Sequence, residues 1–113
     1  MIYAIPKPVD GIIVTISQWS IREVIYGDNK QRTHHLVGYI PDEGAGRVTS
    51  VIQTFNKENK IITTRSGRIY KLYGAAGTND DAQYVWESWM MFNDAREEVD
   101  VTKQYFNTTH FEI

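Results

Sequence analysis

The amino-acid sequence predicts an α+β fold, in which an antiparallel, partly closed β-sheet of five to seven strands carries one C-terminal helix packed on it. Two observations lead to this prediction. Residues 47–74 contain three runs of β-branched and apolar residues joined by two tight turns, a pattern typical of strands. Residues 80–93 instead repeat apolar side chains with helical spacing. With 113 residues, the chain (1–113) is expected to form a single globular domain around one core.

The segment 47–74 is expected to form a three-stranded meander. Its first turn lies at residues 56–59, where Asn tolerates left-handed backbone angles. Its second lies at Ser66-Gly67, because Gly supplies the positive φ of a two-residue hairpin. The resulting register puts Val48, Ile52, Ile61, Tyr70 and Leu72 on one face and Val51, Phe55, Ile62, Ile69 and Tyr73 on the other. Both faces are half apolar, so both need cover, inside a barrel or under a helix. SH3-like and OB-like barrels are the nearest familiar shapes.

Further strands are expected before the meander. Residues 12–19 alternate as a strand, with Ile12, Val14 and Ile16 on one side and Ile13 and Trp19 on the other. Residues 20–26 fit a strand better than the short helix that a capping box at Ser20 would start. Residues 30–33 are expected to be a polar loop and residues 34–40 a strand. The Gly-rich connection 41–46 lacks the spacing and the Lys of a phosphate-binding loop, so a surface loop is expected.

Residues 80–93 carry the convincing helical pattern of the sequence. Thr78 or Asn79 is suited to cap the N-terminus, and Asp80 and Asp81 favour the positive end of the helix dipole. The expected apolar stripe consists of Ala82, Val85, Trp86, Trp89, Met90 and Phe92. After the helix, weak alternation through Val99, Val101 and Tyr105 predicts a last strand, followed by an extended end from Phe106.

Composition and motifs argue against several classes of protein. The chain has no cysteine, which rules out disulfides, thiolate metal sites and a cysteine nucleophile. No apolar run approaches the roughly 18–20 residues of a membrane span, and residues 1–11 do not read as a secretion signal. We therefore expect a cytoplasmic protein without membrane contact. No catalytic or dinucleotide motif occurs, so neither an enzyme nor a cofactor is expected. His34 and His35 would point to opposite faces of a strand, and His110 adds no metal-ligand spacing.

Charge is segregated along the chain, although the net charge is only −2. Residues 47–71 contain six basic residues and one acid, whereas residues 80–100 contain seven acids and one base. The two segments either neutralise each other across the fold or form a positive and a negative face that steers a charged partner.

Five residues are candidates for contact with a partner: Arg65, Arg68, Tyr70, Trp86 and Trp89. Arg65 and Arg68 flank the predicted turn, where they are either solvated or grip a carboxylate or phosphate with two guanidinium forks. Trp86 and Trp89 share a helical face and are either core residues or interface anchors. Tyr70 belongs to the basic meander, which would offer stacking surfaces to a nucleic acid together with Tyr73 and Phe55.

The pattern Thr64-Arg65-Ser66-Gly67-Arg68-x-Tyr70-x-Leu72-x-Gly74, followed by Tyr84-Val85-Trp86-x-x-Trp89, resembles short uncharacterised proteins of bacterial prophages and other mobile elements. This resemblance covers residues 46–89, transfers no functional residue, and implies a host factor or a phage component as partner. The leading expectation is a small cytoplasmic, non-catalytic protein that acts by occupying a protein partner, with a homo-oligomer left open. The alternative is a nucleic-acid-binding β-barrel that uses the basic segment, against which the acidic pI of about 5.9 argues.

Overall fold

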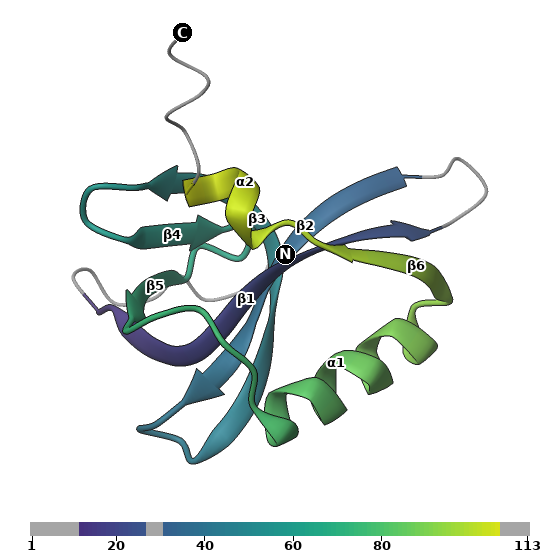
Figure 1. The fold of residues 1–113 in the computed structure, drawn as a ribbon, viewed down its shortest axis with the longest axis horizontal. Coiled ribbons are helices and arrows are strands. Elements are labelled where there is room, and N and C mark those ends of the chain that lie inside the picture. The colour runs from purple at the N-terminus through teal and green to yellow at the C-terminus, as the bar shows by residue number, and fades with distance from the viewer. Residues whose placement is uncertain (1–11, 27–30, 107–113) are drawn as a thin grey trace, which may run out of the picture.

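A β-sheet organises the computed structural model, which describes residues 12–26 and 31–106 (Figure 1). In chain order its elements are β1 (Val14–Tyr26), β2 (Gln31–Ile40), β3 (Ala45–Asn56), β4 (Ile61–Thr64), β5 (Ile69–Tyr73), α1 (Asp80–Phe92), β6 (Ala95–Asp100) and α2 (Thr102–Phe106). The predicted lead-in before residue 12, the turn at residues 27–29 and the chain end after residue 106 lie outside the described residues.

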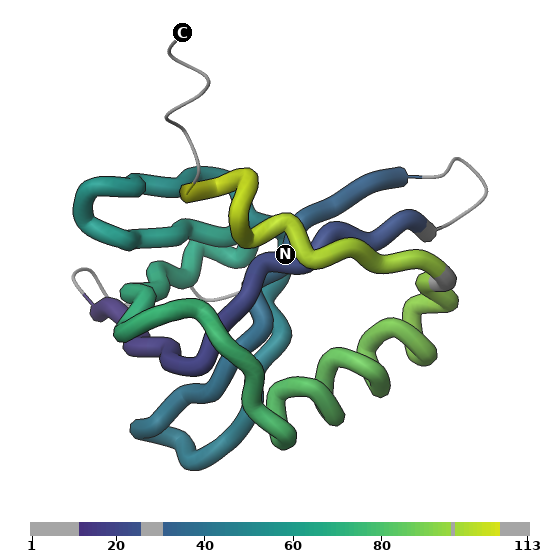
Figure 2. Tube along the Cα trace, viewed as in Figure 1, coloured from purple at the N-terminus to yellow at the C-terminus, as the bar shows by residue number. Residues whose placement is uncertain are grey.

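Five strands close into a ring. The strand order is β2-β3-β4-β5-β1-β6 and β1 also pairs with β2, so β1 to β5 close on themselves and β6 extends the sheet beyond the ring. The strand pairs are antiparallel except β1–β5, which is parallel. Figure 2 shows β1, in purple, crossing the molecule from the β5 side to the β6 side. The prediction of an α+β fold with a partly closed, mostly antiparallel sheet and one packed helix is confirmed.

Strand β1 belongs to the closed ring and also pairs with β6, which extends the sheet beyond it. Its first residues pair with β5, and its last residues pair with β6 and β2. Between these halves Gln18 has a φ of 46° and the register with β2 shifts, which marks a β-bulge. The bulge brings Trp19 into the same core as Ile16, so the prediction that these two side chains lie on opposite sides is wrong. The predicted strand at residues 20–26 is confirmed as the second half of β1.

The three strands of the meander are confirmed as β3, β4 and β5. The register of β4 with β5 differs by one residue from the prediction, and that of β3 with β4 differs by one to two residues. Thr64 N–H donates to the Arg68 carbonyl (3.1 Å) and Gly67 has a φ of 91°, so the second turn has three residues instead of two. Ile62 therefore lies directly opposite Tyr70 and shares its core. The predicted assignment of Ile62 to the opposite face is wrong, because a slip of one residue exchanges the faces of a strand.

Both faces of the sheet are covered, as the half-apolar strands predict. A first core fills the ring and contains Ile16, Trp19, Ile21, Leu36, Ile40, Ile62, Tyr70, Leu72 and Val101. A second core lies between the sheet and α1 and contains Val24, Val37, Ala82 and Trp86, with Val48, Trp89, Met90 and Ala95 packed against it. Strands β1 and β2 contribute to both cores, since successive residues of a strand point to opposite faces.

Helix α1 spans the residues that the sequence predicts. Asn79 is the N-cap, and its side-chain Oδ1 accepts a hydrogen bond from Ala82 N–H (2.9 Å). The inclusion of Phe92 in the buried stripe is wrong, because this side chain is 92% exposed. Phe92 follows the buried Trp86 by six positions, which corresponds to roughly 240° around an α-helix, so the two side chains point in different directions.

Two boundaries differ from the prediction. The last strand runs from Ala95 to Asp100, and the residues after it form helix α2 instead of continuing the strand. Asp100 Oδ1 accepts a hydrogen bond from Thr102 N–H (2.9 Å), a capping contact that favours the short helix. Residues 31–33 belong to β2 and not to a polar loop, because β2 pairs along the second half of β1. Among the described residues, no helix is long and apolar enough to cross a lipid bilayer.

Candidate binding surfaces

The tip of the β4–β5 hairpin presents Arg65 and Arg68, which are both exposed. Its backbone is held against β3: Arg65 N–H donates to the Val51 carbonyl (2.8 Å), and Ser66 N–H donates to Ser50 Oγ (3.1 Å). A backbone that is fixed in this way reduces the entropy lost when an arginine grips an anion. The tip therefore has the geometry expected of a polar contact.

Trp86 and Trp89 stack on each other on the side of the sheet that α1 covers. Their ring centroids are 5.4 Å apart and their planes differ by 4°. Trp86 is fully buried, whereas Trp89 is partly exposed. Trp86 is thus a core residue without surface to offer a partner, and Trp89 is the member of the pair that reaches solvent.

His35 packs on this stack from β2, with its ring centroid 4.6 Å from that of Trp89. Its Nδ1 is 2.8 Å from the Thr49 carbonyl oxygen and its Nε2 is 2.8 Å from Thr33 Oγ1. The carbonyl can only accept, so Nδ1 carries the proton and Nε2 accepts from the hydroxyl in the neutral ring. Burial lowers the pKa of His35, and the charge of Arg65 acts in the same direction.

Arg22 joins β1, α1 and β6 through its guanidinium group. Nη1 donates to Glu98 Oε1 (2.9 Å), Nη2 to Gln83 Oε1 (3.1 Å) and Nε to Ser20 Oγ (3.0 Å). Trp86 Nε1–H donates to the same Glu98 oxygen (2.9 Å), and Arg22 Cζ lies 5.7 Å from the Trp86 ring centroid. This cluster fastens the helix to the sheet. No local sequence pattern reveals it, because its members come from separate elements.

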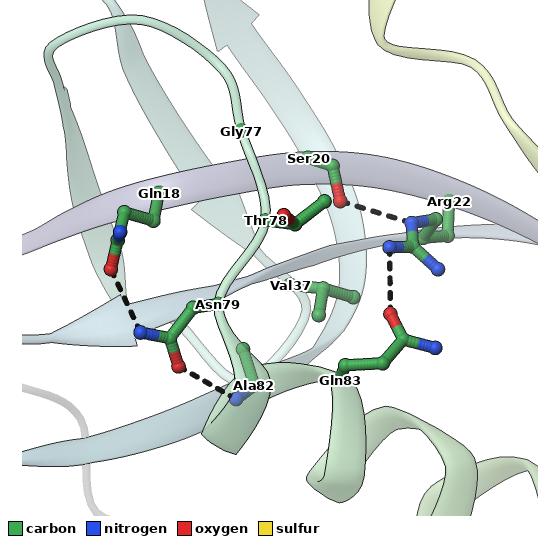
Figure 3. A pocket seen from close by; sticks show the side chains of 9 residues that line it. All are labelled: Gln18, Ser20, Arg22, Val37, Gly77, Thr78, Asn79, Ala82 and Gln83. Carbon is green, nitrogen blue, oxygen red and sulfur yellow. Dashed lines mark hydrogen bonds between the residues drawn. The ribbon is translucent and has the colours of Figure 1, made fainter.

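A shallow crevice lies beside Arg22, between β1 and the start of α1 (Figure 3). It is lined by Gln18, Ser20, Arg22, Val37, Gly77, Thr78, Asn79, Ala82 and Gln83. Figure 3 shows several of these side chains bonded to one another: Asn79 Nδ2 donates to Gln18 Oε1 (2.8 Å), and Arg22 donates to Gln83. In the described part of the chain, every buried side-chain nitrogen and oxygen has a hydrogen-bond partner. The crevice therefore offers a ligand no unpaired buried polar side chain.

Three side chains, those of Glu23, His34 and Tyr105, are joined by hydrogen bonds on the face of the sheet away from α1. His34 Nε2 is 3.0 Å from Glu23 Oε2, and His34 Nδ1 is 2.6 Å from the Tyr105 hydroxyl. The hydrogen bond from His34, aided by Arg32, lowers the pKa of Glu23. A histidine between a carboxylate and a hydroxyl has the order of a nucleophile triad. Burial raises the pKa of Tyr105 above its ordinary value, and its hydroxyl contact with His34 connects α2 to β2.

The aromatic residues of the meander are divided between core and surface. Tyr70 is buried in the ring, and its hydroxyl accepts a hydrogen bond from Arg47 Nη1 (3.1 Å). Phe55 is partly buried and packs edge-on against Phe106, with centroids 5.0 Å apart. Tyr73 is exposed. Of the three aromatic side chains expected to stack on a nucleic acid, Tyr73 alone is openly displayed on the surface.

Some residues of the basic and the acidic segment form ion pairs with residues that belong to neither segment. Glu98 and Asp100 lie 2.9 and 3.9 Å from guanidinium nitrogens of Arg22 on β1. Arg47, in the basic segment, pairs with Glu43 in the preceding turn. These ion pairs do not join the basic to the acidic segment.

The outer face of α1 carries exposed apolar side chains. Tyr84, Met91 and Phe92 are 72%, 79% and 92% exposed. They stand at positions i, i+7 and i+8, with Ser88 at i+4, so they line one side of the helix. The same spacing can be read from the sequence, but the stronger stripe that faces the sheet conceals it.

Within residues 12–26 and 31–106, no three His, Cys, Asp or Glu side chains come together in a way that would hold a metal ion, and His110 lies outside these residues. Comparisons of the chain with known protein families, with characterised proteins and with solved structures find no match.

Proposed function

We propose that this chain is a small, non-catalytic binding protein that acts by occupying a protein partner, with the outer face of α1 as its principal contact. The observation that carries this proposal is the stripe of Tyr84, Met91 and Phe92, all more than two-thirds exposed on one helix. Aromatic and methionine side chains are enriched at the centres of protein interfaces. Large apolar side chains gathered on one exposed face are typical of surfaces that bind.

The helix as a whole supports the same conclusion. Ala82, Trp86 and their neighbours fill the core on one side, while the exposed stripe makes the opposite side apolar as well. A helix that is apolar on two sides is normally buried on both. Asp80, Asp81 and Glu87 surround the outer stripe with negative charge. The partner that fits is a protein with an apolar groove and a basic rim, which binds an amphipathic helix by anchors at positions i, i+7 and i+8.

The hairpin tip is a second, polar contact in this proposal. Arg65 and Arg68 would grip an anionic group of the partner, and Trp89 is partly exposed on α1, whereas Tyr70 and Trp86 support the surface from within the cores. Replacing both arginines with Ala should leave the melting temperature nearly unchanged and weaken binding, with a loss that shrinks as salt rises.

The resemblance to prophage and mobile-element proteins favours a bacterial host factor as the partner and the cytoplasm as the place of action. A protein that blocks such a factor needs no catalytic group, because occupancy of the groove suffices. Phage-encoded modulators of host factors are the class to which this proposal assigns the chain.

The test is a pulldown from nuclease-treated bacterial lysate with three forms of the purified chain. The wild type and Tyr73→Ser, which changes an exposed aromatic side chain on β5 and not on the helix, should both recover the same protein in stoichiometric amount. The triple variant Tyr84→Ser, Met91→Ser, Phe92→Ser should lose it while melting at nearly the wild-type temperature, because exposed side chains contribute little to stability. Equal recovery by the triple variant, or no stoichiometric protein with any form, would refute the proposal.

A nucleic-acid-binding β-barrel is the alternative function. The exposed Tyr73 beside Lys71 on β5 favours it, since base stacking combined with a cation is a common mode of single-strand binding. Labelled single-stranded oligonucleotides can be titrated at several salt concentrations and followed by fluorescence anisotropy. Tight binding that falls steeply with salt, and that Tyr73→Ser abolishes, would establish the alternative instead.

A further inference from the structure

Strand β6 forms an open edge of the sheet. It is the last strand in the order, and β1 is its one neighbour among the strands of residues 12–26 and 31–106. Figure 1 shows it continuing the sheet beyond the closed ring, above α1. The edge therefore has backbone groups that no described strand pairs.

The register identifies these groups. Val101 N–H donates to the Ile21 carbonyl (2.8 Å), so Ile21 directs its backbone toward β6. Backbone groups alternate along an antiparallel strand, so Glu23 and its β6 partner Val99 also face each other. The intervening residues of β6, Glu98 and Asp100, therefore direct their N–H and C=O groups away from β1. They form a row of donors and acceptors to which another strand can pair.

The side chains along this edge select the strand that can bind. Glu97 and Val99 project to one face, while Glu98 and Asp100 project to the other. Strand β6 contains these three acids and one base, Arg96, and Arg22 on β1 compensates a further charge, which leaves the edge with a small net negative charge. Val99 is 52% exposed and adds an apolar position between the charges. The pattern complements an extended segment that places Lys or Arg opposite Glu97 and, two positions further along the same face, an apolar residue opposite Val99.

We propose that the outer edge of β6 binds an extended, Lys- or Arg-bearing segment of a partner protein by strand addition. The backbone hydrogen bonds supply affinity, and the acidic side chains supply selectivity. The site is separate from the outer face of α1, so this inference does not depend on the proposed function. The occupant that fits better is a basic segment and not a second copy of the chain, because β6 contains three acids and one base.

The experiment uses the full chain, labelled with ¹⁵N, and a synthetic peptide of about eight residues that repeats Lys-Thr-Val-Thr, so that Lys and Val alternate on one face of the added strand. Binding should shift the amide signals of Glu98 and Asp100 and slow their hydrogen exchange, because these N–H groups become bonded. A peptide of the same sequence that is N-methylated on the amides of its pairing edge keeps the charge and removes those hydrogen bonds. It should bind at least about tenfold more weakly if backbone pairing contributes.

Matched variants test the role of charge. Glu97→Lys should weaken peptide binding roughly five- to thirtyfold, since an attraction becomes a repulsion. Glu58→Lys, on the exposed turn before β4, changes the net charge equally and should leave binding unaltered. The triple α1 variant should also bind the peptide normally, which separates this site from the proposed function.

Three results would overturn the inference. The N-methylated peptide could bind as tightly as the unmodified one, which would reduce the interaction to non-specific charge attraction. Glu58→Lys could weaken peptide binding as much as Glu97→Lys does, which would likewise reduce the interaction to non-specific charge attraction. The signal shifts could fall on residues away from β6, or be absent at millimolar peptide, in which case the acidic edge serves only to prevent self-association.

Discussion

Gly46 of β3 and Ala82 of α1 lie in direct backbone contact. A Cβ atom added to Gly46 would stand 2.5 Å from both the Cα and the N of Ala82. Helix α1 thus starts where strand β3 carries no side chain, and this contact sets the distance between the helix and the sheet. The Gly-rich connection before the meander, which invites comparison with a phosphate-binding loop, provides in Gly46 the space that the helix needs.

Gly46→Ala is therefore expected to destabilise the protein by about 1–3 kcal/mol, because backbone atoms cannot move aside as a flexible side chain can. Urea unfolding followed by circular dichroism measures the change. Gly77→Ala is the matched control: its added Cβ would come no closer than 4.0 Å to Gln18, and its stability should hardly differ from wild type. Equal stability of both variants would mean that α1 is not seated on β3 as described.

The two stacked tryptophans should differ in their effect on stability. Trp86→Ala removes a fully buried side chain and its hydrogen bond to Glu98, so a loss of roughly 3–5 kcal/mol in the free energy of unfolding is expected. Trp89→Ala should cost less, since this side chain is partly exposed. Chemical denaturation of the two variants gives the comparison. A larger loss for Trp89→Ala would contradict the burial pattern.

The hairpin turn should tolerate change at Ser66 better than at Gly67. Gly67 has a φ of 91°, which a β-branched residue strongly resists, so Gly67→Val should lower the melting temperature markedly. Ser66→Ala keeps the backbone N–H bond to Ser50 and loses only the 3.2 Å hydroxyl contact with Thr64. Its melting temperature should stay close to the wild-type value. Similar melting temperatures for both variants would place the turn elsewhere.

Acidification should destabilise the fold through His35. Burial lowers the pKa of His35 below its ordinary value of 6.5, so the unfolded chain takes up a proton in a range where the folded chain does not. The free energy of unfolding should therefore fall as the pH decreases from 6.5 to the lowered pKa. Unfolding curves at a series of pH values measure this slope, and His35→Gln should remove it. An unchanged slope in His35→Gln would exclude His35 as its source.

Glu23 affects the stability of the fold in a range of pH different from that of His35. Its pKa is lowered from 4.5, chiefly by the hydrogen bond from His34, so the stability that its ionised form adds is complete above 4.5. That contribution is lost as the pH falls through the lowered pKa. The two residues are therefore distinguishable in one pH series, with His35 acting first as acid is added.

The sequence predicts the elements of this fold better than the directions of their side chains. Helix α1 was predictable because Asn79, the early aspartates and the apolar spacing agree. The position of Trp19 was not predictable, because the bulge at Gln18 depends on the pairing of β1 with both β5 and β2. The register of β4 and β5 depends on whether a Ser-Gly turn has two or three residues, which its composition leaves undetermined.

The candidate surfaces show the same limit. Exposure of Arg65 and Arg68 was expected from their place beside a turn, and both are exposed. Burial of Tyr70 and Trp86 could not be decided from sequence, because a large aromatic side chain suits a core and an interface equally well. The Arg22 cluster and the edge of β6 arise only when distant segments pair, so the local spacing of residues in the sequence does not predict them.

The parallel seam between β1 and β5 has a consequence for how the chain folds. The neighbouring pairs from β1 to β5 join consecutive strands, which can meet soon after they are made, whereas Val14 must find Tyr70 across about half of the chain. Hairpins form in microseconds, while closure over such a distance is slow. The ring should therefore close late, after its hairpins exist. Trp19 donates its indole N–H to the carbonyls of Tyr73 and Gly74 beside this seam, so its fluorescence is placed to report the closing step.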